Sequence, residues 1–530
     1  MRKPRIMFDH DGRHPLIYMY EPPINKEELE AAVDELVGTP VEALMLTLGD
    51  TRSLLYDTEA GELWGQHIAK WPHVIWRRAH QNFKKLIAEG NDPLKVICER
   101  AHSKGMMVYP SLLVQHGPRE RMLQSWAKSE WSESDWQRDI QPLEIGIDGD
   151  VEPDFPGYRC LDFKHKEVRD KAFAVIEEVL TQYPVDGFEL KLNYHPFYFH
   201  PNVVETGRGI MTEWIARVYE AVKKSGPYRE LAVHIPISIT GCLSVGLDPQ
   251  EWIRQSIVDV LIPESLTVID AAADFRPLVA AAKDSNCRVH AAIANHVDSD
   301  RLGAASIEML RAAACNYWAQ GVDGLYLAHW FASWPYYASF YEQLRELSHP
   351  DVMAYKDKSY FIPTETNRGQ RLEMHPGATM QLPANLEPEK PVRLNFTVSD
   401  DLSRWGQMER VHEVLLRVRI AACTERDCLN FRLNSKDLPS SLLRRINEMY
   451  RMSAPRYRVF GQWFIFKLDE DHWPVKGSNT LEVTLVHRDP DVTPQIYVRD
   501  VELEIKYLMG KHFHRDFVDV DLGPYEHAVS

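Results

Sequence analysis

The chain has 530 residues, which is room for two or more domains, and 44% of them are hydrophobic and 26% charged, as in an ordinary folded protein. Its 61 Lys and Arg against 77 Asp and Glu give a net charge of −16, so it lacks the basic field that binding to nucleic acid needs. No apolar run approaches the length of about 18 residues that a membrane span requires, and the N-terminus has no signal-peptide pattern.

We therefore expect no nucleic-acid partner, no membrane span and a cytoplasmic location, or a secreted or periplasmic one if a signal was removed. The 7 Cys are scattered without Cys-x-x-Cys spacing. This pattern argues against a disulfide framework or a zinc ribbon and fits a reducing compartment. We expect neither a metal nor a cofactor.

Residues 15–347 alternate short apolar strands with amphipathic helices. Eight such repeats predict a parallel sheet that closes into a barrel, so we predict an α/β fold with a (β/α)8 TIM barrel over residues 1–350. An open doubly wound sheet is the alternative, but no Gly-x-Gly-x-x-Gly or Walker-type loop is present. The predicted strands are Leu16–Glu21, Ala43–Leu48, Met106–Val114, Val185–Asn193, Leu231–Ser238, Val260–Glu264, Arg288–Ala294 and Gly324–Trp330. The predicted helices include Lys26–Leu36, Pro93–Ser103, Lys166–Gln182, Met211–Lys224, Phe275–Ser285, Ser306–Gln320 and Tyr336–Leu347.

The longest insertion, residues 115–160, follows the third predicted strand. It carries Trp126, Trp131 and Trp136. Loops that follow barrel strands surround the catalytic face, so we expect this insertion to form a lid or a wall of the site. The alternative is an irregular excursion that packs on its own aromatic residues.

The sequence pattern changes after residue 347. Residues 351–392 are rich in Pro and polar residues and are predicted to be a linker. Residues 393–530 then show short alternating strands without helices between them, which predicts an all-β sandwich. The predicted strands are Arg393–Val398, Val411–Ile420, Leu429–Leu433, Trp463–Leu468, Thr480–Val486 and Gln495–Ile505.

Polar side chains occupy the interior face of the fourth predicted strand. Phe188 and Leu190 share the parity that faces the helices, so Glu189 and Lys191 face inward. Barrel interiors are normally filled with Val, Ile and Leu, and an unpaired charge there costs on the order of 5 kcal/mol or more. We therefore expect these side chains to reach the open C-terminal mouth; the alternative is a Glu189–Lys191 pair that only closes the barrel.

The same alternation turns further polar residues towards the mouth. Strand five contributes His234, strand six ends on Glu264, and strand seven turns His290 and His296 inward. The candidate substrate-binding residues are Lys191, Asn193, His195, His234, His296, His329, Trp330, Glu21, Asp50 and Asp162.

Two carboxylates at one mouth are what glycosidic cleavage needs, because one protonates the leaving oxygen and the other attacks the anomeric carbon or activates water. By position, Glu189 and Glu264 are the best catalytic pair. Lys191, two residues from Glu189, is expected to hold that carboxylate ionised, as a nucleophile or stabiliser. Glu264 has no cation near it in sequence and is the expected acid. A sugar ring is expected to lie between the two.

The sequence around these residues resembles a known group of barrels. The motifs are Leu161-Asp162-Phe163 followed by Val168-Arg169, and Val185-Asp186-Gly187-Phe188-Glu189-Leu190. They are similar to the bacterial glycosyl-hydrolase-like, family-10-like TIM-barrel glycosidases, which have an Asp-Phe, a helix that opens with Val-Arg, and DGIELD on strand four. The resemblance covers most of residues 15–350. It implies a poly- or oligosaccharide substrate and acidic residues at the strand ends.

This sequence departs from that pattern at one position. The second acid of DGIELD is Lys191 here, so either Glu189 has taken over its role or the activity differs. Residues 461–483 resemble the W…KGxNxLEV closing strands of the jelly-roll accessory domains of glycosidases, and the turn Lys476-Gly477-Ser478-Asn479 before an alternating strand fits that comparison.

Three functions remain open from the sequence. The first is a glycoside hydrolase acting on a carbohydrate substrate. The second is a non-catalytic carbohydrate-binding barrel, motivated by Lys191 in place of an acid. The third is a lyase or metal-dependent carbohydrate enzyme that uses the histidines. The sequence does not determine the sugar, the linkage, the anomeric outcome or the oligomeric state.

Overall fold

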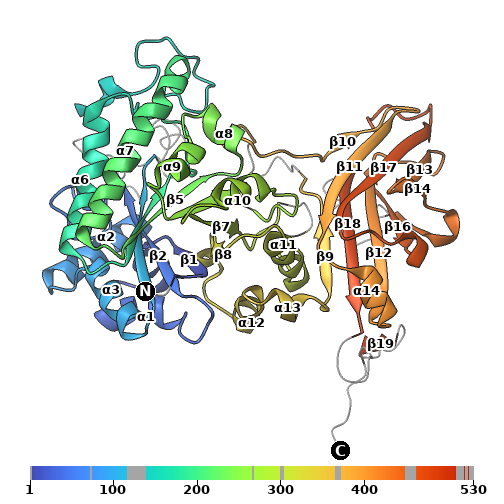
Figure 1. Ribbon diagram of the computed structural model, residues 1–530, viewed down its shortest axis with the longest axis horizontal. Helices are drawn as coiled ribbons and strands as arrows, with labels where there is room; N and C mark the ends of the chain where they lie inside the picture. The colour runs from blue at the N-terminus through green and yellow to red at the C-terminus, as the bar shows by residue number, and fades with distance from the viewer. Residues whose placement is uncertain are drawn as a thin grey trace, which may run out of the picture.

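The computed structural model describes residues 3–71, 74–115, 139–265, 268–298, 302, 304–364, 372–447 and 461–508, and two short strand pieces at 518–519 and 523–524. The described chain forms a barrel unit and a β-sandwich unit that lie next to each other (Figure 1). None of its described helices is long and apolar enough to cross a membrane.

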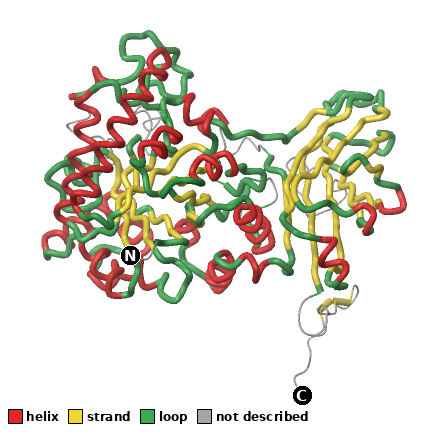
Figure 2. Tube along the Cα trace, viewed as in Figure 1, coloured by secondary structure: helices red, strands yellow, loops and turns green. Residues whose placement is uncertain are grey.

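Eight parallel strands close into a barrel in chain order, and β1 pairs with β8 to complete it. Figure 2 shows these strands surrounded by helices. The predicted TIM-barrel fold is therefore confirmed. The strands are β1 (Ile6–His10), β2 (Ala43–Asp50), β3 (Met107–Leu113), β4 (Gly187–Lys191), β5 (Glu230–Pro236), β6 (Val260–Glu264), β7 (Arg288–Ile293) and β8 (Gly324–Leu327).

Several barrel helices begin at capping residues that satisfy their free N–H groups. Asn25 and Glu28 form a capping box at the first helix, and Asp92 and Asp248 cap helices that start with Pro. The helices are α1 (Lys26–Asp34), α2 (Val74–Ala88), α3 (Pro93–Ser103), α6 (Lys166–Gln182), α7 (Val204–Ser225), α8 (Ile239–Ser244), α9 (Pro249–Gln255), α10 (Arg276–Ala282), α11 (Ile307–Ala319), α12 (Ala338–Leu347) and α13 (Pro350–Met353).

The first predicted strand is wrong. Residues 6–10 form β1, whereas Pro15–Met19, which overlaps the predicted segment Leu16–Glu21, forms a short π-helix. Pro15 explains the difference, because its fixed φ and missing N–H suit the first turn of a helix. Met7 and Asp9 of β1 consequently face the barrel interior, which was not expected.

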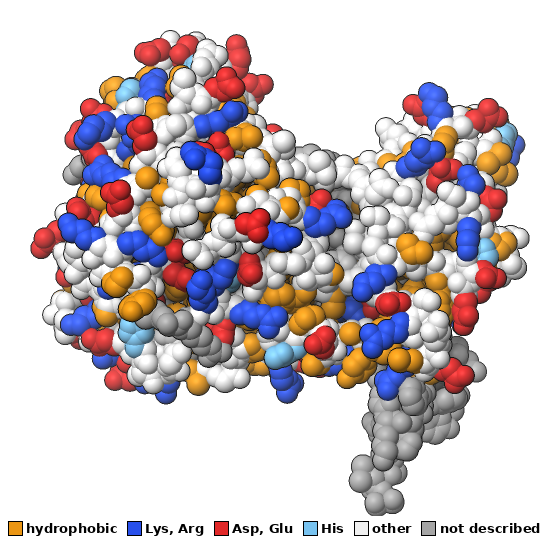
Figure 3. Space-filling model, in the orientation of Figure 1, with side chains coloured by type: hydrophobic (Ala, Val, Ile, Leu, Met, Phe, Trp, Pro, Cys, Tyr) orange, Lys and Arg blue, Asp and Glu red, His pale blue; other side chains and the backbone are white. Residues whose placement is uncertain are grey.

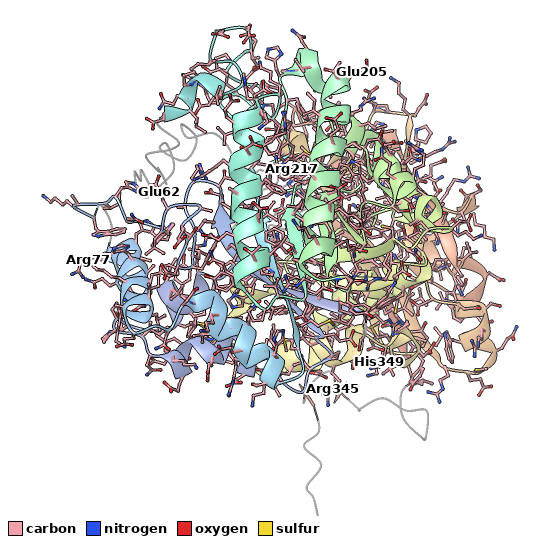
Figure 4. All side chains as sticks on the ribbon, turned by 60° about the vertical axis from the view of Figure 1, so that its left-hand side comes forward. Glu62, Arg77, Glu205, Arg217, Arg345 and His349 are labelled. Carbon is pink, nitrogen blue, oxygen red and sulfur yellow. The ribbon has the colours of Figure 1, made fainter. Side chains whose placement is uncertain are left out.

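Side chains that alternate along the barrel strands form two separate packed layers, one inside the barrel and one between the strands and the helices. Met7, Met45, Tyr109, Ile262 and Tyr326 belong to a buried cluster inside the barrel. The side chains of opposite parity, among them those of β4 that were expected to face outward, belong to the larger core between strands and helices. Helices α6 and α7 lie side by side on the outside (Figure 4), where Arg217 is paired with Asp170 at 2.6 Å.

The second unit is a β-sandwich with two antiparallel sheets. One sheet has the order β10-β18-β12-β16-β15, with β9 also paired to β18, and the other has the order β11-β17-β13-β14. All six predicted strands of this unit are present. The elements are β9 (Lys358–Phe361), β10 (Ala384–Asn385), β11 (Pro391–Val398), α14 (Leu402–Gln407), β12 (Val411–Ala421), β13 (Cys428–Leu433), β14 (Lys436–Asp437), β15 (Leu443–Asn447), β16 (Gln462–Lys467), β17 (Gly477–His487) and β18 (Tyr497–Tyr507), with β19 (Val518–Asp519) and β20 (Gly523–Pro524) as a separate pair.

The expected linker is partly built into the sandwich. Both β9 and β10 lie within residues 351–392 and pair with β18. Helix α11 packs directly against β9 (Figure 1), and Asn316 of α11 donates a hydrogen bond to the carbonyl of Thr397 at 2.9 Å. The two units therefore share a built interface. On the face shown in Figure 3, acidic and basic side chains are interspersed.

Candidate active site

A layer of charged side chains lies above the apolar layer inside the barrel, at the C-terminal ends of the strands. Its members are Asp9, Lys191, Glu189, His234 and Glu264, and each is less than a tenth exposed. The opposite end of the interior is closed by Glu230, which accepts hydrogen bonds from Tyr109 at 2.8 Å and Arg288 at 2.6 Å. The mouth of the barrel therefore concentrates its buried charge.

Lys191 crosses the mouth to the first strand. Its ammonium forms an ion pair with Asp9 and donates to Thr47 Oγ1 at 3.1 Å. Burial alone would lower the pKa of Lys191, but Asp9 and Glu189 raise it, so the side chain stays protonated. Its charge lowers the pKa of Glu189, as expected, whereas the alternative of a direct Glu189–Lys191 pair is not what forms, because the ammonium pairs with Asp9.

His234 lies between the two predicted catalytic carboxylates. Its Nδ1 is 3.4 Å from Glu189 Oε1, and its Nε2 is 3.2 Å from Glu264 Oε2. Burial would lower the pKa of His234, but the two carboxylates outweigh it and raise the pKa to about 9. Because the imidazole fills the space between Glu189 and Glu264, the expectation that a sugar ring lies there is wrong.

Glu189 lies beneath this imidazole and away from the opening. Its side chain has no exposed surface and accepts a hydrogen bond from the hydroxyl of Ser111 on β3. Burial tends to raise its pKa, whereas Lys191 and His234 lower it, and the net direction is down. Glu189 is thus an ionised carboxylate that holds His234 from below.

Glu264 occupies the tip of β6, as the alternation predicted. It accepts a hydrogen bond from Asn193, and His329 Nε2 lies 3.6 Å from its Oε1. Burial would raise the pKa of Glu264, but His234 and His329 lower it well below the ordinary range. These neighbours favour the ionised carboxylate of Glu264 over the protonated acid expected from the sequence.

The histidines at the rim differ in their charge. His329 has left-handed backbone geometry at φ 63°, and Glu264 raises its pKa against the effect of burial. Burial lowers the pKa of His296, and the nearby charge of His329 lowers it further. His195 Nε2 lies 3.1 Å from the carbonyl of Pro156, in the described part of the 115–160 insertion.

Two residues that were candidates for the mouth lie away from the opening. Trp330 is fully buried, and its indole N–H donates to the carbonyl of Ile293 at 2.8 Å. It packs against Phe340 in the core, so the expectation that it binds substrate is wrong. His290 is also fully buried and lies near Arg288, where burial and that charge lower its pKa.

The three additional acidic candidates have local contacts. Glu21 is exposed and paired with Arg78 of α2. Asp50 accepts from the backbone N–H groups of Arg52 and Ser53, at 2.9 and 3.1 Å, in the turn after β2. Asp162 accepts from the backbone of Lys164. None of these contacts joins the three to the layer around Glu264.

Trp126, Trp131 and Trp136 lie outside the described residues. The sequence reasoning also missed three residues of the charged layer or its lining: Asp9, Ser111 and Tyr326. The ring of Tyr326 lies edge-on to His234, with a centroid distance of 4.8 Å. Alternation along Ile6–His10 would have placed Asp9 in the interior, had this segment been recognised as the first strand.

The chemistry open to the mouth is that of carboxylates and imidazoles. Among the described residues, no three His, Cys, Asp or Glu side chains are grouped so as to hold a metal ion. Lys191 is kept protonated by its neighbours, so its amine is a poor nucleophile for a Schiff base. The layer can stabilise positive charge through Glu264 and supply a proton through an imidazolium.

A separate cavity of about 380 Å³ lies where the barrel meets the sandwich. Its lining includes Arg417, Glu504 and Lys506. The guanidinium of Arg417 pairs with Glu504 at 2.9 Å, and Lys506 pairs with Glu413 at 3.0 Å. Arg417 and Lys506 of this lining are therefore each paired with a carboxylate.

No family model and no curated protein matches the chain. Among solved structures, α-L-fucosidase isoenzyme 2 from Paenibacillus thiaminolyticus is similar with 13% identity and a TM-score of 0.43, over 68% of this chain and 51% of that one. The endo-β-1,4-mannanase from Thermotoga petrophila has 10% identity and a TM-score of 0.42, over 94% of this chain and 97% of that one. The endo-1,4-β-mannanase from Rhizomucor miehei has 10% identity and a TM-score of 0.43, over 66% of this chain and 95% of that one.

The aligned part of this chain thus spans about half the length of the fucosidase. The resemblance of the sequence to family-10-like glycosidases stays a prediction, because no family model matches.

Proposed function

We propose that the barrel hydrolyses a glycosidic bond of a poly- or oligosaccharide, with Glu264 as the carboxylate that meets the substrate. The observation that carries this proposal is the charged layer at the mouth, where Asp9, Lys191, Glu189, His234 and Glu264 are nearly buried together. Burying such groups costs several kcal/mol each before pairing offsets it. Barrel interiors are otherwise apolar, and catalytic groups of TIM barrels lie at the strand ends.

Glu264 suits the role of nucleophile or charge stabiliser. It ends β6, and its neighbours keep it ionised. A carboxylate in this state can attack the anomeric carbon or stabilise an oxocarbenium-like transition state. Glu189 is a positioning residue in this account, because it contacts His234 and has no exposed surface.

The leaving oxygen also needs a proton. His329 is the best-placed donor, since its side chain is 28% exposed and its pKa is raised beside Glu264. The imidazolium would give its proton to the glycosidic oxygen as the bond to the anomeric carbon breaks, and water would then complete hydrolysis. Asp9, held by Lys191, is the second carboxylate of the mouth.

A non-catalytic carbohydrate-binding barrel is the second candidate. The observation that favours it is that the pKa values of both Glu189 and Glu264 are lowered, so neither has the raised pKa of an ordinary carboxylic acid catalyst.

A paired screen separates the two candidates. The full chain is incubated with aryl glycosides and with soluble polysaccharides, and released sugar is measured. The same polysaccharides are cast into native gels to measure retardation. Hydrolysis supports the proposed function, and retardation without hydrolysis supports the binding barrel. If the whole panel shows no hydrolysis and no retardation, both candidates are contradicted.

A further inference from the structure

The stretch between β9 and β10 is described at residues 362–364 and 372–383, and both of its ends contact the sandwich. Thr364 and Leu382, at its two ends, form a parallel bridge. Before it, the backbone N–H of Ile362 donates to Val501 of β18 at 3.0 Å. Next to Leu382, the Gln381 side chain accepts from the N–H of Asn395 on β11 and donates to its carbonyl, each at 2.7 Å. Both ends are therefore fixed to the sandwich.

The middle of this stretch reaches the barrel. A Cβ atom on Gly241 of α8 would lie 2.3 Å from the carbonyl oxygen of Pro376, so only glycine permits this approach. Gly377 has φ 83°, and a Cβ there would lie 1.9 Å from Ser238 Oγ. Two glycines thus allow the two backbones to meet closely.

The contact lies on the catalytic side of the barrel. Ser238 follows the C-terminal end of β5 and caps the first turn of α8, where its hydroxyl accepts from Gly241 at 2.9 Å. Loops that follow barrel strands form the mouth. Met374 and Ala378 pack against the barrel core on either side of the contact, which fixes the position of the residues between them.

His375 is one of the residues between these anchors. The charges of Glu264 on β6 and of His329 after β8 both act on its imidazole, as does the charge of Glu373 on its own segment. Its ring is therefore close to the part of the mouth where the proposed nucleophile and proton donor lie. The close contacts at Gly241 and Ser238 place this segment at the mouth, and the charges of Glu264 and His329 act on its imidazole there.

We infer that the sandwich unit supplies a substrate-binding residue to the barrel, and that His375 binds a hydroxyl group of the sugar next to Glu264. This inference rests on the proposed function and extends it to substrate recognition. It also gives the sandwich a role at the site.

The protonation state of the His375 imidazole suits this role. Burial lowers the pKa of His375, and His329 lowers it further, while Glu264 opposes them. A neutral imidazole has one N–H donor and one acceptor nitrogen, which matches a sugar hydroxyl that both accepts and donates. His329, in contrast, has a raised pKa. The two histidines therefore serve different functions beside the same carboxylate.

The kinetic test uses His375→Ala in the full chain, with His349→Ala as the matched control. His349 is exposed after α12, at the end of the barrel opposite to the start of α7 at Glu205 (Figure 4). On a substrate found in the screen, His375→Ala should raise KM about tenfold with kcat within about threefold, because the lost contact binds ground and transition states alike. His349→Ala should match the wild type. An unchanged KM in His375→Ala overturns the inference.

A second variant displaces the segment without touching His375. Gly241→Ala places a methyl group against Pro376 and should raise KM in the same direction as His375→Ala. The double variant should then add little to either single one, because both remove the same contact. Full additivity of the two effects would contradict the inference.

A titration tests the placement independently of turnover. The His375 resonance is assigned from its loss in His375→Ala, and its pKa is compared in wild type and Glu264→Gln. Since the Glu264 charge raises the pKa of His375, the variant should titrate at lower pH. An unchanged pKa overturns the inference, whatever the catalytic result.

Failure of the inference differs from failure of the proposed function. Hydrolysis with an unchanged KM in His375→Ala removes only the role of His375. If the chain binds polysaccharide without hydrolysing it, retardation in native gels replaces KM as the readout, and loss of retardation in His375→Ala still supports the inference. If neither hydrolysis nor retardation is found, the inference and the proposed function are both contradicted.

Discussion

Lys191 forms its ion pair with Asp9 on β1 and not with Glu189, although Glu189 lies only two residues away on the same strand. The lysine side chain thereby spans the barrel mouth and joins β4 to β1. Thr47 on β2 accepts a second hydrogen bond from the same ammonium at 3.1 Å. The position that matches the second acid of the DGIELD pattern thus holds a lysine that pairs across the barrel.

We expect Lys191→Met to destabilise the barrel strongly, because it leaves the Asp9 carboxylate buried without its cation. Breaking a buried pair from one side costs about 3–5 kcal/mol, and the double variant Asp9→Asn, Lys191→Met should recover part of that loss. Chemical denaturation measures both. Lys390→Met, which removes the cation of an exposed pair with Glu387, is the control and should change stability little. Equal losses in the single and double variants would contradict a direct pair.

Stability should depend on pH through His234. Its pKa is raised to about 9 in the folded chain, above the ordinary value of 6.5. The stabilisation is therefore fully present below about pH 6.5 and is lost as the pH rises through about 9, with a size on the order of 3 kcal/mol. The raised pKa of His329 acts in the same direction. Denaturation of the wild type at pH 6.5 and at pH 9.5 measures this loss, which should be much smaller in His234→Gln.

Glu189→Gln should lower the stability of the chain and the pKa of His234, because Glu189 is a positioning residue in this proposal. The variant removes a charge that raises the pKa of His234, so the His234 pKa should fall below about 9. The free energy of unfolding should fall by about 1–3 kcal/mol, because the buried imidazolium loses a partner. Nuclear magnetic resonance of the imidazole and thermal unfolding check the two effects. An unchanged His234 pKa would show that the two groups do not interact.

The interface between the two units should be needed for a soluble barrel. Nine consecutive residues of α11, Met309–Tyr317, are buried, because the helix lies between the barrel and β9 (Figure 1). A chain of residues 1–356 would expose one side of this helix and should bind a hydrophobic dye or aggregate, unlike the full chain. A monodisperse truncated barrel with no dye binding would argue against this interface.

The sequence patterns predicted the architecture well where the signal is local. Alternation on β4 placed Glu189 and Lys191 inside, and the strand tip at Glu264 was predicted correctly. The first strand was missed because Ile6–His10 is short and ends in two polar residues, while the more apolar residues after Pro15 form a π-helix.

Contacts between distant parts of the chain could not be predicted from the sequence. The Lys191 partner depends on which strand faces β4 across the barrel, and that strand had been misplaced. Likewise, Lys358–Phe361 is too short and polar to indicate a strand. It forms one because it pairs with β18. The contact of Pro376 with Gly241 depends on how the segment before β10 packs on the barrel, which no pattern within one segment predicts.

The most direct test of the account is the turnover of Glu264→Gln on a substrate found in the screen. Glu251→Gln on α9, where the carboxylate pairs with Arg254 on the surface, is the matched control and should keep wild-type turnover. If Glu264 is the carboxylate that meets the substrate, kcat should fall by about 10²–10³-fold or more, because the charge that stabilises the transition state is lost, while circular dichroism remains that of the folded chain. Turnover of Glu264→Gln within about threefold of the wild type, a barrier change of roughly 0.7 kcal/mol, would contradict the account.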